Sequence, residues 1–367
     1  MTTSDIIHQR LVNQQIARTK FKTVQDIVGW MGAMQAQEFT MVKWAIGLRL
    51  PGSTEADIEL AFNNGEILRT HLLRPTWHFV TPADIRWMLA LTAPRVHAAN
   101  AYIYHQCELP AALLNKCANI VAKTLEGGKH LTRHALKAAL EKKKIITDGL
   151  RLSCIMMYAE LEGIICSGAR QGKQFTYALI DEWAPEKIYQ RGATSFHKKD
   201  ALGELTTRYF TSRGPASAQD FAYWSGLTVK EAKEGIEMLS ASFGRETWKN
   251  QEYIFLPEKT RANNTHSTFL LPVYDEYGLS YKDRGAMTGK EMPAAIDARK
   301  VVFHRIVIVD GRAGGVWQRT DDKGVVAQAT PFLSLPKSKH TAIDKAVKRY
   351  NTFFSGAKPS NRKSRKK

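Results

Sequence analysis

The stretch RLSCIMMYAELEGIICSGARQGKQFTYAL, residues 151–179, decides the fold class predicted for this chain. Its first part carries apolar residues at the spacing of one helix face: Leu152, Ile155, Met156 and Ala159. Gly163 ends this helix, and a Gly-rich basic tip follows. Beyond the tip Phe175, Tyr177 and Leu179 alternate on one face, as in the second strand of a β-hairpin. A helix followed by such a hairpin predicts a winged helix, with Arg170 and Lys173 at the tip of its wing.

The same unit, short helices followed by two strands, recurs before and after this stretch. Two capping boxes, Ser217 with Asp220 and Thr228 with Glu231, predict two helices joined by a Gly-containing turn at residues 225–227. This spacing is typical of a helix-turn-helix, and residues 248–256 can form its wing. The N-terminal copy is the least regular, with helices expected over residues 5–17, 23–34, 55–63 and 82–96 and a hairpin over residues 67–80.

Beyond residue 265 the apolar pattern changes from a helical period to a period of two, which is typical of strands. Strands are expected over residues 268–273, 301–309, 315–319 and 325–329. Asp310-Gly311 is a hairpin turn signal, and a helix is expected from Thr341. The fold prediction is therefore mainly α with small β wings (α+β): three tandem winged-helix units, a small C-terminal antiparallel sheet or barrel, and a terminal helix. The units are expected at residues 1–105, 106–196 and 197–265, the β element with its capping helix at 266–357, and a disordered basic tail at 358–367.

The chain has 367 residues and 44% apolar content, enough for a substantial core. Its longest apolar runs are far shorter than the roughly 18 to 20 residues of a membrane span. It has neither the pattern of a signal peptide nor a CxxC pair among its four cysteines. These features predict no membrane partner, no disulfide framework and no zinc finger. They favour a reducing location, in the cytoplasm and associated with the nucleoid.

The net charge of +18 points to a polyanionic partner. The last ten residues carry six Lys and Arg and no acid, so the remainder still carries +12. A winged helix binds double-stranded DNA with a helix in the major groove and a wing on the backbone. Winged helices also serve as protein-interaction modules and packing scaffolds. Because no heptad or other dimerisation helix is visible, a monomer is expected.

The candidate catalytic segment is GAMQAQE, residues 32–38. Gln35 and Gln37 are expected to end an apolar helix, where residues two apart point about 200° apart, so they converge only if the helix frays. Converging amides can hold a water and a sugar oxygen without carrying charge. The alternative is two solvated glutamines at a helix end. Glu38 is a further candidate, either as a general base or as a surface carboxylate.

A second polar group lies at residues 275–284, where Asp275 and Glu276 are followed by Asp283 and Arg284. Paired acids are compatible with a general base. The favoured interpretation is structural: Arg284 pairs with Asp275 or Asp283 and fixes the loop between the third winged helix and the sheet.

His71 and His78 flank Arg74-Pro75 and lack a third ligand at metal spacing. Contact with the DNA backbone or a satisfied position in the core is therefore preferred to metal binding, and no metal or cofactor is expected. The residues predicted to contact DNA are Arg69, His71, Arg74, His78, Arg170 and Lys173.

Five blocks carry a resemblance to a known family: GAMQAQ at 32–37, WAIGLR at 44–49, RTHLLRPTWHFV at 69–80, CSG with GKQFTY between 166 and 177, and YDEY with YKDR between 274 and 284. In these blocks the chain resembles the AlkZ/YcaQ family of winged-helix DNA glycosylases, over about residues 8 to 320. The resemblance implies three winged helices in a C-shaped arrangement. It also implies removal of alkylated purines, or unhooking of interstrand crosslinks, by cleavage of the N-glycosidic bond. The family's Gln-apolar-Gln motif falls on Gln35 and Gln37, and the Asp of the YcaQ branch is absent.

The functional expectation is a DNA-repair enzyme of base excision, a monofunctional glycosylase that hydrolyses the N-glycosidic bond of alkylated purines without a metal. An N7- or N3-alkylated purine is already cationic, so it leaves without a strong general acid. Neutral amides can then suffice to place a water and stabilise the sugar. The alternatives are a non-catalytic winged-helix DNA-binding regulator and a scaffold kept for a role unrelated to DNA.

Overall fold

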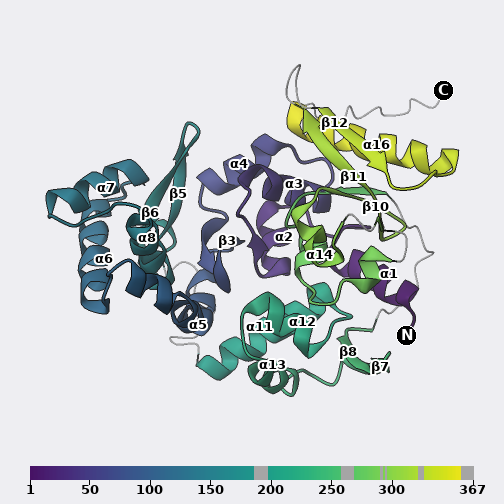
Figure 1. The fold of residues 1–367 in the computed structure, drawn as a ribbon, viewed down its shortest axis with the longest axis horizontal. Coiled ribbons are helices and arrows are strands. Elements are labelled where there is room, and N and C mark those ends of the chain that lie inside the picture. Colours follow the sequence, from purple (N-terminus) through teal and green to yellow (C-terminus); the bar gives the residue numbers. More distant parts are fainter. Residues whose placement is uncertain (186–196, 258–267, 290–291, 294–295, 321–325, 357–367) are drawn as a thin grey trace.

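The computed structural model describes residues 1–185, 197–257, 268–289, 292–293, 296–320 and 326–356. Over these residues the chain is a mixed α+β protein, as expected, in which helices alternate with hairpins and small sheets (Figure 1). The expected basic tail at 358–367 lies outside the described residues. None of the described helices combines the length and the apolar character that a membrane span needs.

The N-terminal part contains five helices and the first three strands. They are α1 (Thr3–Asn13), α2 (Val24–Met31), β1 (Met34–Gln35), α3 (Phe39–Arg49), α4 (Glu55–Asn63), β2 (Leu68–Leu72), β3 (Arg74–Val80) and α5 (Ile85–Gln106). Three expectations are corrected here. The helix expected to reach Met34 ends at Met31, because Gly32 adopts a φ of +69° that breaks the helical path. The helix α3 was not predicted, and α5 continues ten residues beyond the predicted end near Val96.

The middle part has the helix and the hairpin predicted from residues 151–179, and it also has the helix α6, which was not predicted. Its elements are α6 (Ala111–Leu125), β4 (Leu131–Thr132), α7 (Arg133–Lys142), α8 (Arg151–Leu161), β5 (Ile165–Gln171), β6 (Gln174–Leu179) and α9 (Ile180–Trp183). Gly163 follows α8 with a φ of +68°, which turns the chain into β5.

The first two hairpins join in one six-stranded sheet with the order β1-β3-β2-β5-β6-β4. The junction is the antiparallel pair Arg69 and Ser167, between β2 and β5. Figure 1 shows α6, α7 and α8 grouped with β5 and β6 on one side of α5. The candidate motif therefore lies on the first strand of a sheet that reaches into the middle of the chain.

The third part begins at residue 197. It contains α11 (Lys198–Arg213), α12 (Ala218–Ser225), α13 (Val229–Ile236), β7 (Gly244–Trp248) and β8 (Gln251–Phe255). Both predicted capping boxes are present, and Gly226 ends α12 in the left-handed conformation. The hairpin β7–β8 starts four residues before the predicted position.

The C-terminal part is a four-stranded antiparallel sheet with the order β12-β11-β10-β9, covered by a helix. Its elements are β9 (Phe269–Leu271), α14 (Glu276–Leu279), α15 (Gly285–Thr288), η1 (Ala298–Phe303), β10 (Ile306–Val309), β11 (Arg312–Thr320), β12 (Val326–Pro331) and α16 (Lys337–Ser355). The strand predicted over 301–309 is wrong in its first half, which is the 3-10 turn η1. The hairpin turn at Asp310-Gly311 is confirmed by φ values of +50° and +82°.

The N-terminal and C-terminal parts share one hydrophobic core. Trp44 of α3 stacks edge-on against Tyr350 and Phe353 of α16, and its Nε1 donates to the carbonyl of Leu270 at 2.7 Å. In Figure 1 the C-terminal sheet and α16 lie beside α3 and α4. This packing brings the segment after β9 against β1, although some 240 residues of sequence separate them.

Candidate functional site

The motif is not helical, which corrects the helical expectation: Met34 and Gln35 form the strand β1, and Gln37 lies in a bend two residues after it. β1 pairs antiparallel with β3, and Gln35 lies opposite His78. The Ala36 N–H donates to the Trp77 carbonyl at 2.7 Å, so pairing continues one residue past β1. Gln37 lies beyond the strand, so strand alternation does not fix the direction of its side chain relative to that of Gln35. Gln35 is half-buried and Gln37 is exposed.

Gln35 and His78 form a pair of the kind whose backbones do not hydrogen-bond to each other. The Ala36 bond to Trp77 sets this register, and the Gln35 N–H points away from β3, toward Glu276 Oε1 at 2.9 Å. In such pairs the Cα atoms are closest, about 4.5 Å apart, and the side chains face one another. The side chains of Gln35 and His78 are therefore direct neighbours.

Glu276 is a fully buried carboxylate that holds the backbone of β1. Its Oε2 accepts from Arg213 Nη2 at 2.9 Å, from Trp224 Nε1 at 3.0 Å and from Ser280 Oγ at 2.9 Å. Burial raises the pKa of Glu276, but the charge of Arg213 and the Gln35 N–H outweigh it and lower the pKa to about 2. Both oxygens of Glu276 already accept hydrogen bonds. A structural role therefore fits Glu276 better than the role of a general base.

Arg213, from α11, fixes the turn that leads into β1. Its Nη1 donates to the Met31 carbonyl at 2.6 Å and its Nη2 to the Ala33 carbonyl at 2.9 Å. This buried arginine was missed by the sequence analysis. Its only sequence signal is a cation at the end of an amphipathic helix, which solvent-exposed arginines share.

Asp275 also has a structural role, but its partner is not the predicted Arg284. Asp275 accepts two bonds from the Arg49 guanidinium, at 2.8 and 2.9 Å. Arg284 instead donates to the Gly278 carbonyl and to the Tyr223 hydroxyl. Asp283 accepts the Gly285 N–H at 2.8 Å. Arg49 and Asp275 are both buried, so this pair is shielded from water.

Four buried polar atoms lie on the same sheet face as Gln35 and have no hydrogen-bond partner among the described residues. Thr70 lies opposite His78 on β2, and Thr76 precedes His78 by two residues, so all four side chains share that face. The atoms are Gln35 Oε1, Thr70 Oγ1, Thr76 Oγ1 and His78 Nε2. Because buried polar groups are normally paired, such a concentration is typical of a functional site.

His78 is a neutral imidazole. Burial and the nearby Arg74 lower its pKa to about 3. Its Nδ1 is 2.9 Å from the Thr76 carbonyl, which can only accept, so Nδ1 carries the proton. His78 Nε2 is therefore a bare acceptor.

Arg69 connects the motif to a cationic pocket. Its Nε donates to the Ala36 carbonyl at 3.0 Å, and its guanidinium lies 4.3 and 4.5 Å from the ring centroids of Trp77 and Phe175. Burial lowers the pKa of Arg69 to about 10. The pocket beside it has a volume of about 640 Å³, and no carboxylate lines it. Its cationic and imidazole lining is Arg69, Arg133, His134, Lys137 and Lys173.

Among the other predicted DNA contacts, only Lys173 is exposed. His71 is buried and bonds through Nδ1 to the buried Glu160, as expected of a satisfied core histidine. Arg74 is half-buried, and its Nη1 donates to the Tyr223 carbonyl. Arg170 is held against α4 by Glu59 at 2.8 Å, so it is not free at the wing tip. Glu38 is exposed and directly precedes α3.

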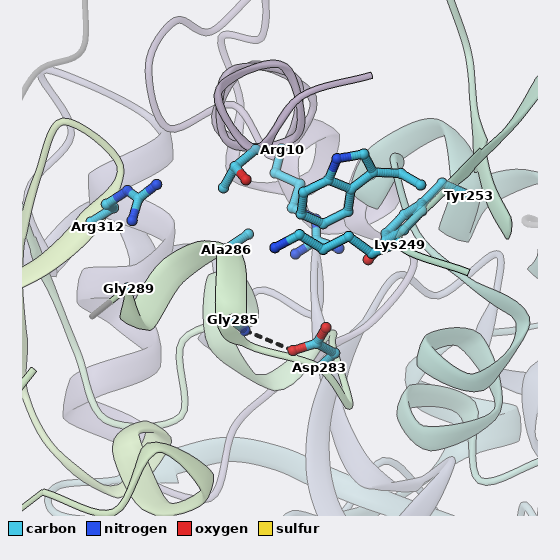
Figure 2. Close-up of a pocket in the computed structure, with 10 residues that line it drawn as sticks. Arg10, Lys249, Tyr253, Asp283, Gly285, Ala286, Gly289 and Arg312 are labelled. Carbon is cyan, nitrogen blue, oxygen red and sulfur yellow. Dashed lines mark hydrogen bonds between the residues drawn. The ribbon is translucent and has the colours of Figure 1, made fainter. Parts of the chain in front are cut away.

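A separate pocket of about 420 Å³ lies between α1, the β7–β8 hairpin and α15. Figure 2 shows Lys249 and Arg312 at this pocket, with Asp283 bonded to the Gly285 N–H. Asp283 lines this pocket, but none of the residues predicted to be catalytic or to contact DNA does. The described residues contain no group of three or more His, Cys, Asp or Glu with the geometry of a metal site.

Fold and site together define a mixed α+β protein with a cationic pocket beside a polar strand pair, and comparison with known proteins identifies the family. Residues 28–353 match the family described as DNA glycosylase AlkZ-like, so the chain belongs to this family of DNA-repair glycosylases. It is similar to the interstrand DNA cross-link repair glycosylase of Streptomyces sahachiroi, with 22% identity over 340 residues and 88% of each chain covered. It also shares the fold of the solved Streptomyces sahachiroi DNA glycosylase AlkZ, with a TM-score of 0.77, 20% identity and 98% of each chain covered.

Proposed function

We propose that this protein is a monofunctional glycosylase that releases alkylated purines from double-stranded DNA by hydrolysing the N-glycosidic bond. Gln35 and Gln37 are the proposed catalytic residues. The observation that carries this proposal is the anchoring of the motif: the Gln35 N–H bonds to Glu276, the Ala36 carbonyl bonds to Arg69, and Gln37 is exposed directly after them. The name of the Streptomyces sahachiroi relative supports interstrand crosslinks as a second class of substrate.

The chemistry asks little of the protein beyond positioning. The cationic base is a good leaving group, and the sugar develops positive charge as the bond breaks. A carboxamide oxygen can accept a hydrogen bond from the attacking water and face the developing charge. Two neighbouring amides can hold the water and a sugar oxygen together, which reduces the entropy cost of the reaction. Hydrolysis needs no covalent link to the enzyme and leaves an abasic site.

We propose that the DNA backbone passes over the pocket beside Arg69. Lys173 and Lys137 would contact phosphates there, and Arg69, Arg74 and Arg170 would contribute positive potential from half-buried or buried positions. His71 and His78 are assigned interior roles instead, because both are buried.

The organisation into three winged-helix units at 1–105, 106–196 and 197–265, with the C-terminal element at 266–357, is likewise a proposal. It rests on the hairpins that follow each group of helices. A monomer that encloses the duplex and works near the nucleoid fits this arrangement.

The deciding experiment measures single-turnover release of N7-methylguanine from a duplex, with the enzyme in excess. Q35A and Q37A should each lower the rate by about ten- to a thousandfold, the scale of losing one positioned polar group. Q25A, on the exposed side of α2, is the matched control and should cleave like the wild type. DNA affinity should remain within about twofold.

Wild-type rates in both Q35A and Q37A would move the site elsewhere. Absence of any release from N7-methylguanine, N3-methyladenine and crosslinked duplexes, with tight DNA binding retained, would instead favour a non-catalytic DNA-binding protein.

A further inference from the structure

We propose that His78 is a positioning residue: its Nε2 accepts a hydrogen bond from the carboxamide NH₂ of Gln35, which turns Gln35 Oε1 toward the reacting sugar. This inference rests on the proposed function, since it concerns the orientation of a proposed catalytic amide. It adds a role for a buried residue that otherwise only fills the sheet.

The side chains of Gln35 and His78 are cross-strand neighbours. Gln35 and His78 are directly opposite on β1 and β3, in the pair type with the shortest cross-strand distance. The β1 strand is short, so His78 is the cross-strand neighbour through which the sheet can hold the Gln35 side chain.

The hydrogen-bonding capacity of the two side chains supports the proposal. His78 Nε2 and Gln35 Oε1 are both acceptors, both are buried, and neither has a partner among the described residues. Two acceptors cannot bond to each other. The two ends of a carboxamide are nearly isosteric, and a half-turn about its terminal bond exchanges oxygen for NH₂. In the orientation proposed for Gln35, the NH₂ donates to Nε2 and Oε1 faces away from His78.

Three other side chains around His78 carry hydrogen-bond donors. Thr70 and Thr76 carry hydroxyl donors and Arg74 carries a guanidinium, yet none of them forms a hydrogen bond with this atom. The charged or titratable groups that act on His78 are Arg74, Glu276 and His71. The Thr76 carbonyl fixes the proton on Nδ1, so Nε2 can only accept. The carboxamide NH₂ of Gln35 is therefore the donor that we assign to His78 Nε2.

The proposal explains why a neutral, buried histidine is useful here. An acceptor that does not ionise near neutral pH fixes the amide in one orientation at all working pH values. A solvated glutamine would instead sample both orientations and present its NH₂ to the water for part of the time, which opposes the accepting role.

The test combines a spectroscopic and a kinetic measurement on the full chain. In ¹⁵N-histidine NMR of the free protein, the His78 ring should be the neutral Nδ1–H tautomer with Nε2 hydrogen-bonded. Q35A should shift the Nε2 resonance toward a free acceptor, and Q37A should leave it unchanged. A charged His78 at pH 7, or an Nε2 resonance indifferent to Q35A, overturns the proposal, whether or not the protein releases base.

The kinetic measurement is a double-mutant cycle in single-turnover cleavage. H78F should lower the rate about ten- to a hundredfold in the wild-type background and have no further effect in the Q35A background. H78Q places an acceptor near the position of Nε2 and should recover part of the lost rate. H105Q, an exposed histidine of α5, is the matched control.

Equal losses from H78F in both backgrounds would show that His78 acts independently of Gln35 and contradict the proposal. If H78F fails to fold, as circular dichroism would show, H78Q and the NMR measurement decide. If Arg74 is the true donor, R74Q rather than Q35A will shift the Nε2 resonance, which also overturns the proposal.

Discussion

Glu276 Oε1 accepts the backbone N–H of Gln35 at 2.9 Å, across 241 positions of sequence. This bond fills the one backbone donor of Gln35 that the strand pair leaves open, because β1 is an edge strand. Glu276 is in turn paired with Arg213, which bonds to the carbonyls of Met31 and Ala33. The candidate motif is thus held by a buried ion pair from two other parts of the chain.

E276Q should destabilise the protein by about 2–4 kcal/mol, because it leaves Arg213 charged and buried without its counter-charge. The amide can still accept one bond, so the fold should persist. Urea unfolding followed by tryptophan fluorescence measures the change. The exposed E38Q is the control and should lie within about 0.5 kcal/mol of the wild type. A loss below about 1 kcal/mol would mean that the pair contributes little.

The contribution of Glu276 should also depend on pH. Its pKa falls from an ordinary 4.5 to about 2 in the folded protein, so the carboxylate stabilises the fold fully above about pH 4.5. That stabilisation is lost as the pH falls from about 4.5 through 2. The difference in unfolding free energy between wild type and E276Q should therefore shrink over this interval. A difference that stays constant down to pH 2.5 would contradict the lowered pKa.

R69Q should lower both stability and base release, because Arg69 bonds to the Ala36 carbonyl and lies between two aromatic rings. The loss of unfolding free energy should be about 1–3 kcal/mol. R69K keeps the charge but lacks the planar guanidinium, so it should restore little. Single-turnover cleavage and thermal unfolding are the measurements, with the exposed R299Q as control. Full activity of R69K would show that charge alone matters.

K173Q and K137Q should weaken binding to any duplex alike, since phosphate contacts carry no sequence information. Each lost contact should flatten the plot of log K against log salt by up to about 0.9. Fluorescence anisotropy at several salt concentrations measures this slope. K345Q, an exposed lysine of α16 outside the pocket, should leave it unchanged. Equal slopes for all three variants would place the DNA elsewhere.

Local sequence signals predicted much of the fold correctly. Period and capping chemistry are properties of neighbouring residues, so the capping boxes of α12 and α13, the hairpin β5–β6 and the turn at Asp310-Gly311 could be read directly. The wrong prediction at Gly32 also came from reading neighbouring residues alone. Gly32 was taken as part of a helix, because the apolar pattern around it does not reveal a positive φ.

The residues of the candidate motif could likewise be found from the sequence, through the family resemblance and the pairing of two amides. The geometry of these residues could not be found from the sequence. The position of Gln35 depends on the pairing of β1 with β3. The partners of Gln35, Asp275 and Ala36 are Glu276, Arg49 and Arg69, which reach them across 33 to 241 positions of sequence. Only tertiary packing selects such partners, because the choice among many arginines and acids depends on which pair is buried together away from water.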